Sequence, residues 1–309
     1  MATPSSSQTK RRRVAVIGLG GIGGAAAGSL AAASRHDVVA CVRQPIARLI
    51  LDAPGGTSAV ALRALTDPAQ VEAPADWVLL CTKTFQTEAT APWLKRLCAP
   101  SSRVAVLQNG IDHVARVAPL VQGATVLPVI VYYNGERLAA DRVRLRQGAN
   151  ADFVVPNDDA GRAFAQLIEG TPLRVQLGDD FITLAWRKLL LNAVASPMTS
   201  LTLQRQAVLR RPDIKALCMD VLAEAIAVGR AEGAKLSDDD AKRTLDTLYT
   251  FAGELGTSMY FDRLAGGKLE IEALNGAIVT AGERHGIATP LNRALLALLR
   301  AVSDAAGKA

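Results

Sequence analysis

The chain has 309 residues, of which half are apolar and only 4% are aromatic, and its formal net charge is +6. A chain of this length can bury two sizeable cores, and the low aromatic content favours an α/β or helical enzyme over a β-sandwich. Four of the positive charges belong to residues 10–13, which leaves +2 for the rest of the chain. Because no basic stripe with interleaved aromatic residues follows, we expect no nucleic-acid partner.

The cysteine and histidine positions favour neither disulfides nor a metal site. The four cysteines lack C-x-x-C spacing and the three histidines are dispersed, as is typical of buried side chains in a reducing compartment. No apolar run reaches the roughly 18 residues that span a membrane. Residues 1–13 are basic and lack the apolar core of a signal peptide. We therefore predict a cytoplasmic protein with a disordered basic tail at residues 1–13, no metal and no membrane partner.

The first half of the chain alternates short apolar runs with helical stretches. Residues 14–17 are β-branched or small and read as a strand buried on both faces, and alanine-rich residues 22–33 read as a helix. Residues 37–42, 77–81 and 104–107 predict further buried strands. This alternation is typical of βαβ units and indicates a doubly wound parallel sheet.

Two of these apolar runs end at polar residues, Thr82-Lys83 and Gln108-Asn109-Gly110. In a parallel sheet, ligand contacts collect beyond the carboxyl ends of the strands, so Lys83 and Asn109 are candidate site residues. Earlier in the chain, Pro54-Gly55-Gly56 predicts a loop.

The character of the sequence changes near Gly178-Asp179. Residues 125–155 are strand-like, whereas residues 216–231 and 292–302 show helical periodicity with few strand signals. We predict an α/β Rossmann-type domain at residues 14–178 that binds NADP, followed by an all-α domain at residues 179–309 that carries substrate and catalytic groups.

A glycine-rich turn follows the first predicted strand. Gly18-Leu19-Gly20-Gly21-Ile22-Gly23 has the G-x-G-x-x-G spacing and opens the predicted helix. Glycines at this spacing permit a tight turn and let backbone N–H groups approach a pyrophosphate at the helix N-terminus. The turn therefore predicts a dinucleotide site that uses Gly18, Gly20, Gly21, Ile22 and Gly23.

The end of the second strand indicates which dinucleotide binds. NAD sites place a carboxylate there, but this strand ends in Arg43-Gln44, with no acid nearby. The planar guanidinium of Arg43 can pair with a 2′-phosphate, and Lys83 can add a second positive charge. We therefore predict NADPH as the cofactor.

The second half carries a set of spaced polar residues. Lys188 and Asn192 lie one helical turn apart in Trp186-Arg187-Lys188-Leu189-Leu190-Leu191-Asn192, and Ser196 lies another turn along. Pro197 follows directly, and we expect the helix to end there. Further on come Ser258-Met259-Tyr260-Phe261-Asp262 and Leu269-Glu270-Ile271-Glu272.

Together these motifs resemble the ketopantoate reductase (2-dehydropantoate 2-reductase) family over residues 14–299. The family has a W-x-K-L-x-x-N segment, an S-M-x-x-D segment and an E-I-[DE] segment in this order, besides the glycine-rich turn, the arginine and the Q-N-G turn. The resemblance implies NADPH-dependent reduction of 2-dehydropantoate in pantothenate biosynthesis, with Lys188 as general acid and Glu270 as its acidic partner near the substrate. It also implies that Asn109, Asn192 and Ser258 hold substrate or nicotinamide.

The chain departs from the family where Ser196 replaces a common asparagine and where Gln206 replaces a second one. Serine is shorter and offers one hydroxyl in place of an amide, so one alternative function is that of a paralogue that reduces another 2-keto acid. Two further alternatives are a β-hydroxyacid dehydrogenase and a non-catalytic NADPH-binding sensor. The sequence also leaves a homodimer open.

Overall fold

The computed structural model describes residues 11–306, which divide into two compact units. The first unit contains the described residues up to Gln108 together with His113–Asp179. The second contains Asn109–Asp112 and the described residues from Asp180 onward. The short segment Asn109–Asp112 therefore follows a strand of the first unit but packs with the second.

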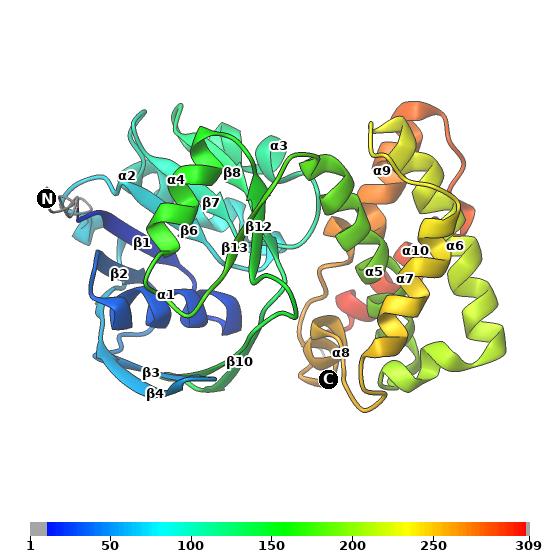
Figure 1. The fold of residues 1–309 in the computed structure, drawn as a ribbon, viewed down its shortest axis with the longest axis horizontal. Helices are drawn as coiled ribbons and strands as arrows, with labels where there is room; N and C mark the ends of the chain where they lie inside the picture. Colours follow the sequence, from blue (N-terminus) through cyan, green and yellow to red (C-terminus); the bar gives the residue numbers. More distant parts are fainter. Residues whose placement is uncertain (1–10, 307–309) are drawn as a thin grey trace, which may run out of the picture. The chain divides into compact units, whose positions relative to one another are not determined.

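A six-stranded parallel sheet forms the centre of the first unit (Figure 1). Its order is β5-β2-β1-β6-β7-β8, the arrangement of a dinucleotide-binding fold, in which the strand order reverses beside β1. Val14, Ala15 and Val16 of β1 have no exposed surface, as expected of a continuous apolar strand that is covered on both faces. The strands are β1 (Arg13–Ile17), β2 (Asp37–Cys41), β5 (Arg63–Leu65), β6 (Trp77–Leu80), β7 (Arg103–Val106) and β8 (Thr125–Pro128).

Helices cover both faces of this sheet, which confirms the doubly wound α/β class. Apolar side chains of α1 (Gly21–Ala33) and α4 (Asp159–Ile168) pack on one face. Those of α2 (Ala91–Leu97) and α3 (His113–Val117) pack on the other face. Short 3₁₀ turns connect these elements: η1 (Pro68–Gln70), η2 (Thr84–Gln86), η3 (Glu88–Thr90) and η4 (Ala118–Leu120).

A second, four-stranded sheet lies on the other side of α1 (Figure 1). The predicted loop at Pro54-Gly55-Gly56 is the tight turn of a hairpin, because Ala53 pairs directly with Gly56. The sequence predicts no strands there, since the segment shows no clear apolar alternation. This sheet contains β3 (Arg48–Ala53), β4 (Gly56–Ala61), β10 (Asn134–Ala139) and β11 (Arg142–Arg146).

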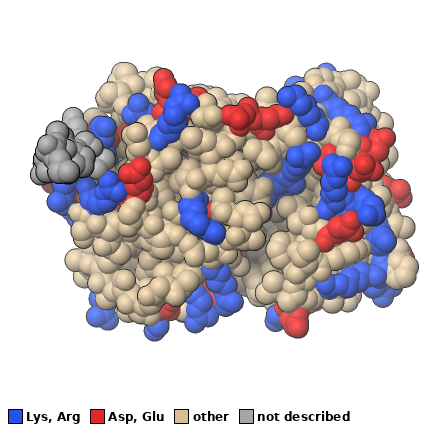
Figure 2. Space-filling model, in the orientation of Figure 1, with Lys and Arg blue, Asp and Glu red and all other residues tan. Residues whose placement is uncertain are grey.

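On the face of the molecule that Figure 2 displays, acidic and basic side chains are interspersed.

A third, three-stranded sheet completes the first unit. Its middle strand pairs in parallel with one neighbour and antiparallel with the other. Phe153 of this sheet packs edge-on against Tyr133 and Phe164, which ties the sheet to the core beneath α4. The strands are β9 (Ile130–Val131), β12 (Phe153–Pro156) and β13 (Val175–Gly178).

The prediction of a disordered tail over residues 1–13 is wrong for its last residues, which contact the first sheet. Arg13 opens β1, and its backbone N–H donates to the Asp76 carboxylate at 2.8 Å. Arg11 pairs with Asp37 at 2.6 Å. The basic run therefore reaches acids at the start of the sheet, while residues 1–10 lie outside the described part of the chain.

The second unit is mainly helical and has no strand among its described residues, which confirms the predicted helical class. Trp186 of α5 lies against Gly229 of α6, where an added Cβ would come within 2.9 Å of the indole ring. No helix in the described part of the chain is long and apolar enough to cross a membrane. The helices are α5 (Phe181–Thr202), α6 (Pro212–Ala231), α7 (Asp239–Thr250), α8 (Ser258–Leu264), α9 (Asn275–His285) and α10 (Pro290–Asp304), with 3₁₀ turns η5 (Gln206–Arg210) and η6 (Ile271–Ala273).

The expected end of the helix before Pro197 is wrong, because α5 continues through this proline to Thr202. A proline inside a helix removes one hydrogen bond and leaves the carbonyl four residues earlier without its helical donor. Here that carbonyl belongs to Ala193, and the side-chain amide of Asn275 donates to it at 3.0 Å. Tertiary packing thus overrides the local preference.

Candidate functional site

The glycine-rich turn between β1 and α1 has the backbone that a dinucleotide site needs. Gly18 has a φ of +90°, which L side chains rarely adopt, and its N–H donates to the Cys41 carbonyl at 3.1 Å. A Cβ at Gly23 would lie 1.9 Å from the Gly18 carbonyl oxygen. The first glycine therefore makes the turn, and the last one lets α1 pack close to β1.

The two middle glycines face different surroundings. Nothing lies within 4 Å of the Cβ position of Gly20, whereas a Cβ at Gly21 would lie 1.7 Å from the Gly135 carbonyl oxygen. The open space at Gly20 is what a pyrophosphate requires when it approaches backbone N–H groups at a helix N-terminus. The residues present therefore fit a dinucleotide.

The structure adds two residues that the sequence patterns do not indicate. Gly135 of β10 crosses directly over Gly21, and the Tyr133 hydroxyl donates to the Ile22 carbonyl at 2.6 Å. The only signal in the sequence is the Asn134-Gly135 pair, which is equally typical of an ordinary turn. These contacts hold the start of α1 in place.

Alanine substitutions should separate the two glycines. Gly20→Ala fills the open space, so we expect NADPH affinity to fall at least about tenfold, about 1.4 kcal/mol, with an unchanged Tm. Gly21→Ala collides with β10, so we expect a loss of stability of about 1–3 kcal/mol as well. Fluorescence titration and thermal melting measure the two effects. Gly55→Ala, which also has open space around it, is the control; equal behaviour of Gly20→Ala and Gly55→Ala would contradict the assignment.

Arg43 and Lys83 lie beyond the two strands that flank β1. β2 and β6 both pair with β1, so residues that follow them lie on either side of the glycine-rich turn. The Arg43 side chain is exposed and Lys83 is half-buried. This placement puts a cation at the strand end where a 2′-phosphate is read in such folds.

In the second unit, α5 presents Lys188, Asn192 and Ser196 at successive turns of one helical face. Lys188 and Asn192 are half-buried, and Ser196 is 4% exposed. Trp186, Leu189 and Leu190 fix the helix in the core. Loss of water around the ammonium group lowers the pKa of Lys188 from 10.5 to about 8.

The start of α8 is tied to α5, which places Ser258. Thr257 caps α8 by accepting from the Tyr260 N–H at 3.1 Å. The same hydroxyl lies 2.8 Å from the Thr199 hydroxyl of α5. Ser258, the first residue of α8, is exposed. It therefore lies beside the helix that carries Ser196.

Asn109 and Glu270 are in direct contact. The Asn109 side-chain amide donates to the Glu270 carboxylate at 3.3 Å, and Glu270 is only 6% exposed. Gly110 makes this approach feasible, because its φ is +102° and a Cβ there would lie 3.0 Å from the Ala273 carbonyl oxygen. The Q-N-G turn thus carries Asn109 to a buried carboxylate 161 residues away in the chain.

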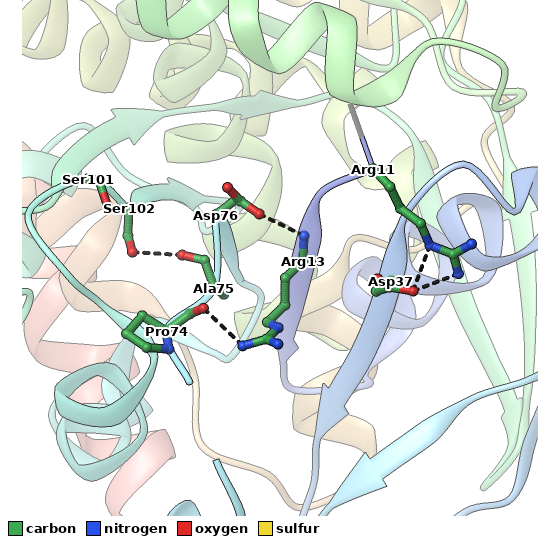
Figure 3. A pocket seen from close by; sticks show the side chains of 8 residues that line it. All are labelled: Arg11, Arg13, Asp37, Pro74, Ala75, Asp76, Ser101 and Ser102. Carbon is green, nitrogen blue, oxygen red and sulfur yellow. Dashed lines mark hydrogen bonds and ion pairs between the residues drawn. The ribbon is translucent and has the colours of Figure 1, made fainter. Parts of the chain in front are cut away.

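A polar hollow of about 310 Å³ lies at the opposite, amino ends of the strands in the first unit (Figure 3). Arg13 opens β1, Asp37 opens β2 and Asp76 precedes β6, and all three line it. Its arginines are engaged with acids and a carbonyl, as the dashed lines in Figure 3 show. None of the candidate site residues lines this hollow.

Comparison with known proteins decides the family. The model of the family described as "Ketopantoate reductase PanE/ApbA" matches residues 14–157, and the model of its C-terminal part matches residues 180–303. The chain belongs to the ketopantoate reductase family. The resemblance seen in the sequence motifs is confirmed, and the chain is an oxidoreductase similar to 2-dehydropantoate 2-reductases.

Two members of the ketopantoate reductase family illustrate the likeness. A 2-dehydropantoate 2-reductase from Caulobacter vibrioides is 39% identical over 290 residues, 94% of this chain and 99% of the relative. A crystal structure of a PanE/ApbA family ketopantoate reductase from Ralstonia eutropha is 31% identical, with a TM-score of 0.85 over 94% of this chain and 98% of that chain.

More distant structures share the fold alone. A D-mandelate dehydrogenase with NADH and anilino(oxo)acetate has a TM-score of 0.84 at 21% identity, over 94% of this chain and 98% of that chain. A ketopantoate reductase from Staphylococcus aureus, described as dimeric, has a TM-score of 0.84 at 24% identity, over 95% of this chain and 99% of that chain. The same architecture therefore serves more than one substrate.

Proposed function

We propose that the protein reduces 2-dehydropantoate to pantoate with NADPH, as a step of pantothenate biosynthesis. The observation that carries this proposal is that one unit contains both an amine with a lowered pKa, Lys188, and a buried carboxylate, Glu270, that accepts from Asn109. An amine and a carboxylate in a partly dehydrated site suit proton transfer to a developing oxyanion.

The first unit would hold the cofactor. The backbone N–H groups of residues 18–23 would hold the pyrophosphate, Arg43 would pair with the 2′-phosphate, and Lys83 would add positive charge on the adenosine side. When bound, NADPH supplies a hydride. We assign residues 14–178 to cofactor binding, apart from Asn109–Asp112, which pack with the second unit, and residues 179–309 to substrate binding and proton transfer.

Lys188 completes the reaction by moving one proton. As the keto carbon gains a hydride, the π pair of the carbonyl bond moves to oxygen and forms an alkoxide. The Lys188 ammonium stabilises this negative charge and donates its proton from Nζ, which leaves a hydroxyl group and a neutral amine. Solvent returns a proton to the amine, since its pKa of about 8 lies close to neutral pH.

The neighbouring polar groups orient the substrate. Asn192 lies one turn from Lys188 on the same face of α5, where its amide can hold the keto acid. Glu270 accepts from a substrate hydroxyl, while its bond with Asn109 fixes the carboxylate. Ser196 and Ser258 contribute hydroxyl groups from α5 and from the start of α8.

A second candidate is the reduction of a different 2-keto acid by the same chemistry. Ser196 offers a shorter side chain than the family's common asparagine, which changes the room at this end of the site. Oxidation of a 3-hydroxy acid and cofactor binding without turnover are the competing functions from different classes of protein. Ser258-Met259 and Glu270 favour a 2-keto acid reductase over the 3-hydroxy acid dehydrogenase. The Lys188, Asn192 and Glu270 set favours an enzyme over a protein that binds the cofactor without turnover.

The test follows absorbance at 340 nm: NADPH oxidation with 2-dehydropantoate and other branched 2-keto acids, and NADP⁺ reduction with 3-hydroxy acids in parallel. We expect rapid turnover with 2-dehydropantoate. Turnover with only another 2-keto acid would move the protein to the second candidate. NADPH binding with no turnover on any of them would contradict the reductase assignment.

We also propose a cytoplasmic homodimer. The support is the dimeric relative from Staphylococcus aureus and the four reduced cysteines, all buried and free of disulfides among the described residues. Analytical ultracentrifugation tests the dimer, and a monomer at micromolar concentration would contradict it.

A further inference from the structure

The proline in α5 leaves a carbonyl group that another element satisfies. Pro197 has no N–H, so the Ala193 oxygen lacks the donor that every interior turn of a helix normally supplies. The side-chain Nδ2 of Asn275 donates to this oxygen at 3.0 Å. Asn275 is fully buried and is the first residue of α9.

Neighbouring groups fix the orientation of the Asn275 amide. Its Nδ2 also donates to the Asn292 Oδ1 at 3.0 Å. Asn292 in turn donates through Nδ2 to the Val221 carbonyl at 3.1 Å and to the Glu224 carboxylate at 2.8 Å. Because these partners only accept, both amides have a single orientation that satisfies the network.

The acceptor of the same side chain is not used. Asn275 Oδ1 is buried and has no hydrogen-bond partner among the described residues. An unsatisfied buried oxygen is unfavourable, because it has lost its hydrogen bonds to water and gained none in the protein. Asn275 therefore combines one unfavourable feature, the unpaired Oδ1, with two hydrogen bonds that its Nδ2 donates, one to Ala193 and one to Asn292.

This one amide joins two parts of the candidate site. Ala193 directly follows Asn192 and precedes Ser196 on α5. On the other side, Asn275 follows η6, the short turn that begins after Glu270 and is closed by a bond from the Ala273 N–H to the Glu270 carbonyl at 3.1 Å. The helix with Lys188 and the segment with Glu270 are thus linked through Asn275.

We propose that Asn275 is a positioning residue: its side chain replaces the backbone donor that Pro197 removes, and so holds Asn192 and Ser196 in place relative to Glu270. This inference rests on the proposed function, since the placement affects the rate only if these groups hold the substrate. A misplacement of about 1 Å at a reacting centre can cost about 100-fold in rate.

A double-mutant cycle with Asn275→Ala and Pro197→Ala tests the proposal. In the Pro197→Ala background the backbone N–H at position 197 can donate to the Ala193 oxygen, so the asparagine is no longer its sole donor. We expect Asn275→Ala to lower kcat roughly tenfold in the natural sequence and no more than about twofold in the Pro197→Ala background. Equal ratios in the two backgrounds would overturn the proposal. If Asn275→Ala does not fold, Asn275→Ser enters the same cycle.

Two further measurements separate positioning from a general loss of stability. Hydrogen exchange of the α5 amides should rise in Asn275→Ala and return in the double variant, which can be read without any substrate. Thr244→Val is the stability control, because it removes a different buried hydrogen bond, from the Thr244 hydroxyl to the Asp240 carbonyl at 2.7 Å. It should lower Tm and leave kcat unchanged. Coupling in exchange and Tm but not in kcat would also overturn the proposal. No turnover by the natural sequence would instead contradict the proposed function.

Discussion

Lys188→Ala is expected to lower kcat for the reduction by about 10²–10⁴, the usual contribution of a positioned general acid. The variant removes both the positive charge that stabilises the alkoxide and the proton that neutralises it. NADPH affinity should be unchanged, because the glycine-rich turn, Arg43 and Lys83, which are proposed to hold the cofactor's phosphates, belong to the first unit. Steady-state kinetics and cofactor titration measure both quantities.

Lys215→Ala is the matched control, since Lys215 is an exposed lysine on α6. Its removal should leave kcat within about twofold of the natural value, as expected of a surface substitution. A Lys188→Ala variant that is folded and retains near-normal kcat would remove Lys188 from the mechanism.

The same lysine predicts a pH profile. Its pKa is lowered to about 8 by loss of hydration, and the reduction needs the protonated form. The rate of reduction should therefore be level below pH 7 and fall about tenfold per pH unit above 8. The reverse oxidation needs the neutral amine, so its rate should rise through the same range. Lys188→Arg stays protonated and should lack this inflection in either direction.

The fold could be predicted to the extent that local patterns set it. The buried strand before Gly18 and the helix after it follow from apolar runs and glycine spacing, and the structure confirms both. The hairpin around Pro54 could not be predicted from local patterns. Its strands are stabilised by packing against α1 and by pairing with β11, and both partners are far away in the sequence. Pro197 is misleading for a related reason, since the donor that lets α5 continue is Asn275, 82 residues beyond Ala193.

The candidate site could likewise be predicted only in part, because local motifs indicate single residues but not the contacts between them. Motif spacing could propose Lys188, Asn192 and Glu270 one by one, but it could not bring Asn109 against Glu270, a contact between residues 161 positions apart. Nor could spacing find Gly135, whose role depends on β10 crossing the start of α1. Sequence patterns identify residue types suited to a reaction, whereas contacts across the chain decide which of them meet.

Arg43→Ala is expected to lower NADPH affinity about 10- to 100-fold and to leave NADH affinity within about twofold. Charge-assisted hydrogen bonds contribute about 1.5–3 kcal/mol, and NADPH differs from NADH only in the 2′-phosphate that would accept them. Arg43 is exposed and lies two residues beyond β2, at the strand end beside the glycine-rich turn. Fluorescence titration with both cofactors gives the ratio directly.

The control for this variant is Arg96→Ala, an exposed arginine in the last turn of α2, which leads back to the amino end of β7. Removing it changes the net charge equally but should change neither affinity, because the strand ends that read the cofactor lie at the other edge of the sheet. Added salt should weaken NADPH binding in the natural sequence more than in Arg43→Ala, since the pair is exposed to screening. An equal loss of NADPH and NADH affinity in Arg43→Ala would show that the arginine supports the turn and does not read the phosphate.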